Sequence, residues 1–393
     1  MNMNFSFSSV FDFSIIDWII LAALLLFFVI QLLFYFLLYK KPYSYFSKKK
    51  ETSIPDEDLQ PVSVVIVSKN ESENLAKHLP VILNQDYPDF EVIVVNMGST
   101  DESDMVLKRL EQTYDNLYHT YVPQEAEEWN EKKLALTLGI KAAKNNVLLF
   151  TEPYCKPVSD QWIRKFAEEF AKGKEIVLGF CKFDISKTIL LRRFILYDNL
   201  VQGIKYLSMA IVHRPFMGTG MNMAYTRDLF FKQKGFSSIL NFEDGEDDLY
   251  INKIANGKNT GVVISPESMT TSDVVNSLSV WRALKSKYLH TKQFYQGFHP
   301  SIFGLETFSK YGFYLSFIAA VCLGLLNANY ILLAVGIVLF IIRYSFQAVI
   351  INRNSKLFGG DKYYVDLIFM DIFQPINNFG FKKCANKKRN KFR

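Results

Sequence analysis

An acidic run near the middle of the chain gathers side chains that could move a proton. It comprises Glu243, Asp244, Glu246, Asp247 and Asp248. A carboxylate beside a bound substrate can act as a general base and take the proton from an attacking hydroxyl. The helix dipole also favours acidic residues in the first turn of a helix. Neighbouring like charges repel one another, so the density of this run favours the chemical interpretation.

Three further polar clusters each follow a short apolar run with the composition of a buried parallel strand. The runs are residues 62–67, 90–95 and 146–150, and the clusters are residues 68–71, 96–101 and 151–154. The spacing of apolar residues predicts helices over residues 70–83, 100–114 and 134–143. Alternating strands and helices predict a parallel sheet that is covered on both faces. Ligands bind beyond the carboxyl ends of such strands, where these polar clusters fall.

Apolar segments flank this α/β region at both ends. Residues 15–39 are long enough to cross a bilayer, which takes about 20 helical residues. Five lysines follow within residues 40–50, so the C-terminal end of this segment is expected to face the cytoplasm. Residues 311–326 and 330–351 predict a helical hairpin with a very short outer turn.

A weaker apolar segment, residues 363–381, contains Asp366, Asp371, Gln374 and Pro375. Charged side chains make a span that is exposed to lipid costly. We therefore expect an interfacial or re-entrant helix here, or a helix buried in the protein core. The basic tail that follows is expected on the cytoplasmic side.

The 393 residues carry a formal net charge of +6, and the basic clusters border the apolar segments. This pattern is typical of the cytoplasmic flanks of membrane helices and argues against a nucleic-acid partner. The four cysteines form no C-x-x-C motif, which argues against a disulfide framework or a zinc site. Membrane lipids are therefore the partners that composition suggests.

Short motifs run in order through the α/β region, at residues 61–71, 94–101, 132–136, 218–225 and 246–249. Together they resemble family 2 glycosyltransferases of the membrane-anchored bacterial type. The resemblance implies a GT-A fold, which is a Rossmann-like α/β domain with a mostly parallel sheet, joined to N- and C-terminal transmembrane helices. The expected domains are an anchor over 1–45, a linker over 46–60, the GT-A domain over 61–300, and a membrane hairpin, interfacial helix and basic tail over 301–393.

The resemblance assigns the polar clusters to a nucleotide-sugar donor. In relatives, the positions of Asn70, Glu71 and Asn96 hold the base and the ribose. Asn96 and Met97 stand where the family usually has two aspartates. Family members often carry a lysine near the donor diphosphate, and here it is Lys132. The implied donor-binding residues are Asn70, Glu71, Asn96, Ser99, Lys132, Glu152 and Tyr154.

Glu152 and Tyr154 occupy the place of the Asp-x-Asp motif of the family. In relatives these carboxylates hold a divalent cation, Mg²⁺ or Mn²⁺, that binds the diphosphate. The replacement leaves three alternatives. Glu152 binds the metal together with donor oxygens and water, cationic side chains replace the metal, or the site is inactive. Because the acidic run is retained, we rank the inactive site below the other two alternatives.

The resemblance also makes the acidic run catalytic. Two alignments of this run with the family motif are possible. If the acidic Glu-Asp pair is matched to the family's pair, the base is Asp247; if Leu249 is matched instead, the base is Glu246. Asp247 is preferred, and Asp248 would then support it or cap the helix. The residues implied on the acceptor and diphosphate side are Gly218, Gly220, Asn222, Lys287 and Tyr288.

The implied enzyme is a hexosyltransferase-type glycosyltransferase that moves one sugar, with inversion, from a nucleotide-sugar to a membrane-associated acceptor such as a lipid-linked glycan. It is expected to work at the cytoplasmic face of the inner membrane, in polysaccharide biosynthesis for the cell envelope. An alternative is an inactive glycosyltransferase-like scaffold in an envelope assembly complex, which is supported by Asn96, Met97, Tyr154 and Leu284. A processive synthase is a further alternative, but Lys287 and Tyr288 keep only the last two residue types of its Gln-x-x-Arg-Trp motif.

Overall fold

The computed structural model of the chain describes residues 13–49, 54–122 and 130–389, with side chains as far as residue 381. Parts of the expected anchor (1–12), linker (50–53) and basic tail (390–393) lie outside the described residues. The chain divides into two compact units, which we call the helical unit and the α/β unit. The helical unit comprises residues 1–41, 297–353 and 362–376, and the α/β unit comprises residues 42–296, 354–361 and 377–393.

A seven-stranded sheet in the order β3-β2-β1-β4-β8-β6-β9 forms the centre of the α/β unit. Its strands are β1 (Val62–Ser68), β2 (Phe90–Asn96), β3 (Leu117–Tyr121), β4 (Val147–Phe150), β6 (Ile176–Leu178), β8 (Met223–Thr226) and β9 (Thr260–Val262). Neighbouring strands pair in parallel, except that β8 runs antiparallel to both β4 and β6. A small second sheet contains β5 (Cys155–Pro157), β10 (Thr270–Ser272) and β7 (Cys181–Phe183).

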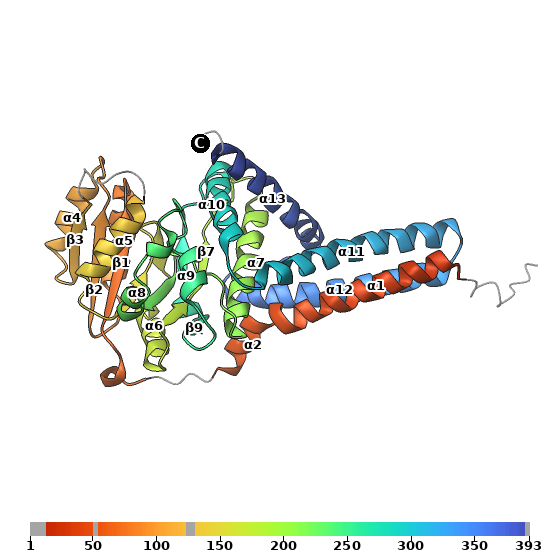
Figure 1. Cartoon of the computed structure of the whole chain (residues 1–393), viewed down its shortest axis with the longest axis horizontal. Helices are drawn as coiled ribbons and strands as arrows, with labels where there is room; N and C mark the ends of the chain where they lie inside the picture. Colours follow the sequence, from red (N-terminus) through yellow and green to blue (C-terminus); the bar gives the residue numbers. More distant parts are fainter. Residues whose placement is uncertain (1–12, 50–53, 123–129, 390–393) are drawn as a thin grey trace, which may run out of the picture. The chain divides into compact units, whose positions relative to one another are not determined.

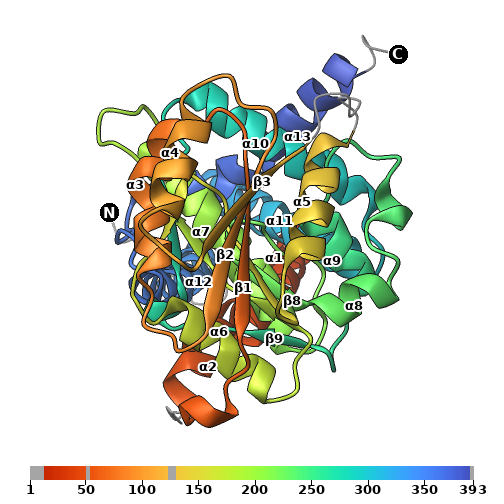
Figure 2. The same cartoon turned by 90° about the vertical axis from the view of Figure 1, so that its left-hand side faces the viewer.

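Helices cover both faces of the large sheet. Figure 2 shows α3 (Ser72–Leu83) and α4 (Ser103–Glu111) on one side of β1 and β2, and α5 (Glu131–Ala142) on the other. α5 approaches β1 closely at Gly139, where an added Cβ would meet Val65 Cγ1 at 2.7 Å. The remaining helices of the unit are α2 (Lys41–Lys48), η3 (Asp56–Asp58), α6 (Trp162–Ala171), α7 (Arg192–Ile211), α8 (Arg227–Lys232), η4 (Ser237–Ile239), α9 (Asp248–Ile254), η5 (Pro266–Ser268), α10 (Leu278–Thr291) and η6 (Lys292–Phe294).

The three predicted strands correspond to β1, β2 and β4, and the three predicted helices correspond to α3, α4 and α5. Every residue of β1 is buried, as expected for a β-branched strand inside a covered sheet. The sequence does not predict β3, because this edge strand has only one buried residue, Leu117, and so lacks an apolar run. The polar clusters after β1, β2 and β4 therefore share one edge of the sheet.

The helical unit contains α1 (Ile15–Phe34), η2 (Tyr35–Tyr39), α11 (His299–Leu326), most of α12 (Tyr330–Leu357) and the first part of α13 (Asp366–Arg389). Among the described residues, three helical segments are long and apolar enough to cross a membrane, namely Ile15–Lys48, His299–Leu326 and Tyr330–Leu357. α1 runs alongside α11 (Figure 1), and Gly312 of α11 packs directly against Phe27 of α1. The Asn329 side chain accepts a hydrogen bond from Leu332 N–H at 3.1 Å and so caps the start of α12.

A cluster of charged side chains lies buried inside the helical unit and comprises Glu306, Lys310, Arg343 and Asp371. An Asp371 carboxylate oxygen lies 2.8 Å from Lys310 Nζ, and the other lies 3.0 Å from Arg343 Nη2. Lys310 Nζ is also 3.1 Å from Glu306 Oε1, so two cations and two anions compensate one another. Phe369, on the opposite side of α13 from Asp371, is exposed. The first part of α13 thus buries Asp371 and Gln374 together with Leu367 and exposes apolar residues on its other side.

Candidate active site

Side chains from distant stretches of the chain meet in one pocket of the α/β unit, with an empty volume of about 340 Å³. Glu152 enters it from the loop after β4, and Lys132 enters it from the first turn of α5. Gly220, before β8, and the pair Glu246 and Asp247, before α9, complete this carboxylate pocket. Glu246 and Asp247 of the acidic run therefore line one cleft with Glu152, beyond the carboxyl end of β4, where open α/β sheets bind ligands.

The turn that delivers the acidic run depends on Gly245. Its φ of +100° lies in a region that favours glycine, and an added Cβ would meet Leu249 Cβ at 2.9 Å. Asp247 then caps α9, because its Oδ1 accepts a hydrogen bond from Asp248 N–H at 2.8 Å. The start of α9 is thus tied to the direction in which Asp247 points.

Two lysines lie among the carboxylates. Lys132 Nζ is 2.7 Å from Glu152 Oε1 and 3.2 Å from Glu246 Oε1, and Lys287 Nζ is 2.7 Å from the same Glu246 oxygen. Although burial would raise it, Lys287 and Lys132 hold the pKa of Glu246 well below its usual range. Glu246 is therefore an ionised partner of two cations, and a carboxylate stabilised in this way is a weak base.

Asp247 lines the same pocket but is held by neutral donors. Its Oδ2 accepts hydrogen bonds from the Tyr288 hydroxyl at 2.8 Å and from Gly220 N–H at 3.0 Å. Glycine suits this approach, because an added Cβ at Gly220 would lie 3.2 Å from Glu152 Oε1 and 3.6 Å from Asp247 Oδ2. The backbone of residue 220 therefore passes between the two carboxylates.

Asp248 points away from the carboxylate pocket and is fully buried. Its Oδ1 accepts a hydrogen bond from Leu249 N–H at 2.7 Å, and its Oδ2 contacts the hydroxyls of Thr291 and, at 2.5 Å, Tyr295. Burial, and then the neighbouring charge of Asp247, raise the pKa of Asp248 to about 8. Asp248 therefore holds its proton at neutral pH and ties the start of α9 to the end of α10.

The loops after β1 and β2 contact each other through residues predicted to bind the donor. Asn70 N–H donates to Ser99 Oγ at 2.9 Å, and Asn70 Oδ1 accepts from Thr100 N–H at 2.8 Å. Asn96 Oδ1 accepts from Ser99 N–H at 2.9 Å. Burial raises the pKa of the half-buried Glu71 beside them. The structure brings these residues together: Asn70 joins the two loops, and Asn96 holds the loop after β2 through Ser99.

The residues in place of the Asp-x-Asp motif are a poor match for a metal centre. Burial, and then the nearby Glu152, raise the pKa of Tyr154 well above its usual range, so Tyr154 stays a neutral phenol. Glu152 is already paired with Lys132. Within the part of the chain that the structure describes, no group of three or more His, Cys, Asp or Glu side chains is placed to hold a metal ion. A lysine ammonium supplies the positive charge between Glu152 and Glu246 instead.

Two residues predicted on the acceptor side, Asn222 and Gly218, lie in the core. Asn222 is fully buried, accepts from Trp162 Nε1 at 2.9 Å, and donates to the carbonyl oxygens of Phe180 and Ser268 at 2.8 and 3.0 Å. Its amide therefore has a structural role. Gly218 is also buried, where an added Cβ would press on core side chains at 3.1 to 3.3 Å. The predicted Gly220, Lys287 and Tyr288 do contact the carboxylates.

Thr219, Thr291 and Tyr295 contact this site and are not identified by the sequence analysis. Thr219 Oγ1 and the Tyr288 hydroxyl are 3.2 Å apart, and Thr291 and Tyr295 both contact Asp248. Tyr288 and Thr291 are three residues apart on α10, and this spacing places them on one helix face. That spacing is the signal from which Thr291 could have been found.

Comparisons with known proteins show what the chain is similar to. Residues 63–232 match the profile of Glycosyl transferase family 2. This match covers less than half of the chain and confirms the resemblance predicted from the sequence. Glycosyltransferase AglE of Haloferax volcanii is 30% identical over 125 residues, which are 31% of this chain and 40% of AglE. The match therefore spans less than half of the length of that relative.

Solved structures with the same architecture are more distant in sequence. Mannosyltransferase PcManGT from Pyrobaculum calidifontis, solved with GDP-Man and Mn²⁺, has a TM-score of 0.52 and 18% identity, over 88% of this chain and 99% of its own. This similarity confirms the predicted α/β fold of the GT-A class. S. aureus TarS 1-349 in complex with UDP-GlcNAc is less similar, with a TM-score of 0.41 and 12% identity over 85% of this chain and 92% of its own.

Proposed function

We propose that this chain transfers one sugar from a nucleotide-sugar donor to an acceptor hydroxyl, with inversion, at a membrane surface. The observation that carries the proposal is the carboxylate pocket, in which Asp247, Glu152 and Lys132 converge from separate parts of the chain. PcManGT was solved with GDP-Man, which supports a nucleotide-sugar as the class of donor.

Asp247 is the proposed base. Glu246 is tied to two lysines, and Asp248 keeps its proton and points away from the pocket. In a single displacement, the acceptor oxygen attacks the anomeric carbon while Asp247 takes the hydroxyl proton. The bond from that carbon to the diphosphate breaks, and its electron pair leaves with the nucleoside diphosphate. The hydrogen bonds from Tyr288 and Gly220 hold the Asp247 carboxylate in position for this step.

Lys132 and Lys287 are the proposed partners of the departing diphosphate. Both ammonium groups lie at the carboxylates of the pocket, and cations in such a position stabilise charge that develops on a leaving group. In other glycosyltransferases of this fold a bound divalent cation supplies that positive charge. The pairing of Glu152 with Lys132 leads us to assign no step to a metal in this chain.

The acceptor is proposed to be a membrane-associated molecule such as a lipid-linked glycan. Three helices of the described residues could cross a membrane, which supports membrane association. The lysines after residue 39 support a catalytic domain on the cytoplasmic side, because basic flanks face the cytoplasm. An anchored catalytic domain meets a lipid-borne acceptor at a raised effective concentration.

The test is a screen of nucleotide-sugars with the purified full-length chain in detergent. Each donor is assayed for thermal stabilisation of the protein and for release of nucleoside diphosphate, with and without membrane lipids from the host. We expect one class of donor to raise the melting temperature and to be turned over, because ligands that bind only the folded state stabilise it. Stabilisation by a donor without turnover under any condition would favour the inactive scaffold instead.

A further inference from the structure

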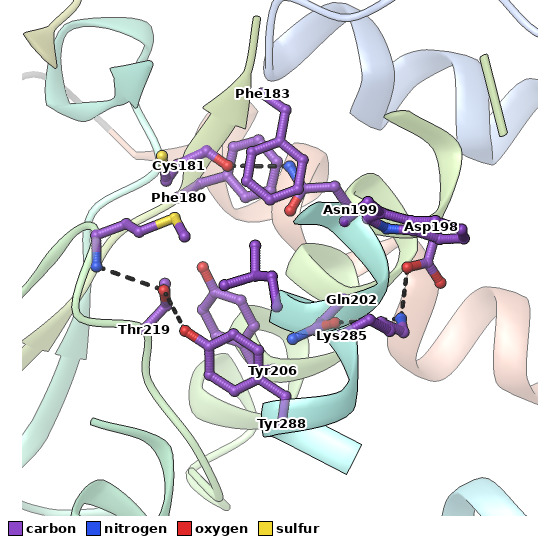
Figure 3. Close-up of a pocket in the computed structure, with 13 residues that line it drawn as sticks. Phe180, Cys181, Phe183, Asp198, Asn199, Gln202, Tyr206, Thr219, Lys285 and Tyr288 are labelled. Atoms are coloured by element: carbon purple, nitrogen blue, oxygen red, sulfur yellow. Dashed lines mark hydrogen bonds and ion pairs between the residues drawn. The ribbon is translucent and has the colours of Figure 1, made fainter. Parts of the chain in front are cut away.

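A second pocket of the α/β unit lies among β7, α7 and α10. Its empty volume, which includes space that is open to solvent, is about 490 Å³. Figure 3 shows the rings of Tyr206 and Tyr288 on one side of this second pocket, facing Phe180 and Phe183 on the other. The resemblance assigns one residue of this lining, Tyr288, to the acceptor and diphosphate side, and the comparisons assign no ligand to the pocket.

The second pocket reaches the proposed base through two hydroxyl groups. Thr219 and Tyr288 both line it, and their hydroxyl oxygens are 3.2 Å apart. The Tyr288 hydroxyl donates to Asp247 Oδ2 at 2.8 Å, and Asp247 itself lines the carboxylate pocket. Tyr288 therefore connects the lining of the second pocket with Asp247, which lines the carboxylate pocket. A molecule in the second pocket could present a hydroxyl to the base while the donor occupies the carboxylate pocket.

The lining of the second pocket combines aromatic faces with a few polar groups. The aromatic residues are Phe180, Phe183, Tyr206, Trp281 and Tyr288. Asn199 and Gln202 add half-buried amides on α7, where Gln202 lies beside Lys285 (Figure 3). Aromatic faces pack against the C–H groups of a sugar ring, and amides pair with its hydroxyl groups. This composition fits a molecule that has both apolar faces and hydroxyl edges.

The charges in the second pocket compensate each other. Asp198 and Lys285 are the charged residues of its lining, and they form a buried ion pair. A phosphate or carboxylate in this pocket would need a cation of its own, because an isolated buried charge is costly. The carboxylate pocket differs in this respect, since Lys132 and Lys287 can face a diphosphate there. The second pocket therefore suits an uncharged ligand.

We infer that the second pocket holds the terminal sugar ring of an uncharged acceptor glycan, an inference that rests on the proposed function. One hydroxyl of that ring reaches Asp247 beside Thr219 and Tyr288. In the transfer step its proton passes to Asp247, its oxygen bonds to the anomeric carbon of the donor, and the electron pair of the broken bond leaves on the nucleoside diphosphate. The acceptor nucleophile is thus a sugar hydroxyl and not a lipid phosphate.

The experiment measures binding without donor, on the full-length chain in a detergent that is not a glycoside. Octyl glycosides of four neutral sugars (glucose, galactose, mannose and N-acetylglucosamine), octyl glucuronide and a short-chain prenyl phosphate are titrated by calorimetry. The test variant is Gln202→Leu, which removes one amide from the second pocket. Gln233→Leu, at the exposed end of α8, is the matched control. Donor hydrolysis and the donor KM are measured in parallel for each protein.

We expect at least one neutral glycoside to bind more tightly than the glucuronide and the prenyl phosphate. Gln202→Leu should weaken that binding about tenfold, because it removes one hydrogen bond to the sugar, and should leave donor hydrolysis and donor KM unchanged. The inference is overturned if no neutral glycoside binds, if the prenyl phosphate binds most tightly, or if Gln202→Leu and Gln233→Leu behave alike. Binding as expected without turnover of any donor would refute the proposed function and leave the pocket assignment standing.

Discussion

Lys132 Nζ and Glu152 Oε1 are 2.7 Å apart, so a lysine ammonium lies beside the carboxylate that the family resemblance assigns to a metal. The same ammonium is 3.2 Å from Glu246 Oε1. Although burial would lower it, Glu152 and then Glu246 help to hold the pKa of Lys132 above its usual range. Lys132 therefore stays charged at any physiological pH, next to the position proposed for the diphosphate.

Lys132→Met should lower kcat/KM for transfer by roughly 10²-fold or more, because it removes one preorganised charge from the leaving group. Lys132→Arg should recover part of that loss, since guanidinium keeps the charge but alters the geometry. The rates are measured with saturating acceptor and varied donor, and a melting curve checks that each variant folds. A Lys132→Met variant as active as the wild type would show that Lys132 does not serve the diphosphate.

Chelation should have little effect on the wild type. The positive charge at Glu152 comes from Lys132, so protein treated with EDTA and assayed in metal-free buffer is expected to keep most of its transfer rate. The measurement is a titration of Mg²⁺ and Mn²⁺ back into the chelated enzyme. Loss of activity on chelation that Mn²⁺ restores would instead favour the alternative in which Glu152 binds a cation.

Asp248 makes stability depend on pH. Its pKa is about 8 in the folded state, raised by burial and then by Asp247, and near 4 when unfolded. Between these values the folded state binds one proton more than the unfolded state. This group therefore lowers stability as pH rises from about 4 to about 8, by at most about 1.4 kcal/mol per pH unit, and the effect levels off above pH 8.

Asp248→Asn should remove that dependence, because an amide reproduces the hydrogen bonds of a protonated carboxyl group. Its melting temperature, relative to the wild type, is expected to increase steadily between pH 5 and pH 8. The transfer rate should stay within a few-fold of the wild type, since Asp248 points away from the pocket. Parallel melting curves for the two proteins across this range would contradict the raised pKa.

The central sheet could be predicted because its strands are short β-branched runs, and their order along the chain implies a parallel arrangement. The antiparallel β8 could not, since four residues such as Met223–Thr226 carry no directional signal. In the helical unit, Arg343 lies within a segment, residues 330–351, that carries no other charge, and its partner Asp371 is 28 residues away in sequence. Ionisable residues within membrane segments usually face a partner, and this rule could have paired them.

The location of the candidate site could be predicted from the sequence, but several of its contacts could not. Ligands bind beyond the carboxyl ends of parallel strands, and this rule predicts that Glu152 and the acidic run lie close together. Glu152, Glu246 and Asp247 do line the same pocket. The position of Lys132 between Glu152 and Glu246 depends on the path of α5, which spacing does not define. Asn222 belongs to a motif that resembles an acceptor segment, yet its amide is used in the core. Only tertiary packing decides whether such an asparagine faces the acceptor or is buried in the core.

The buried charge cluster of the helical unit should be sensitive to the loss of one member. Asp371→Asn leaves Lys310 and Arg343 without their shared carboxylate, and breaking a buried ion pair in this way costs about 3 to 5 kcal/mol. Unfolding in detergent is the measurement, with Asp366→Asn on the same helix as the control. Equal stability of the two variants would mean that the cluster contributes little.

The most direct test of the account is the transfer rate of Asp247→Asn. The amide keeps the size of the side chain and can still accept from Tyr288, but it cannot take a proton. With Glu243→Gln, from the same acidic run, as the control, single-turnover rates are measured with saturating donor and acceptor. We predict a loss of about 10² to 10⁴-fold for Asp247→Asn, an unchanged donor affinity and a rate near wild type for Glu243→Gln. An Asp247→Asn protein that transfers sugar at the wild-type rate would contradict the account.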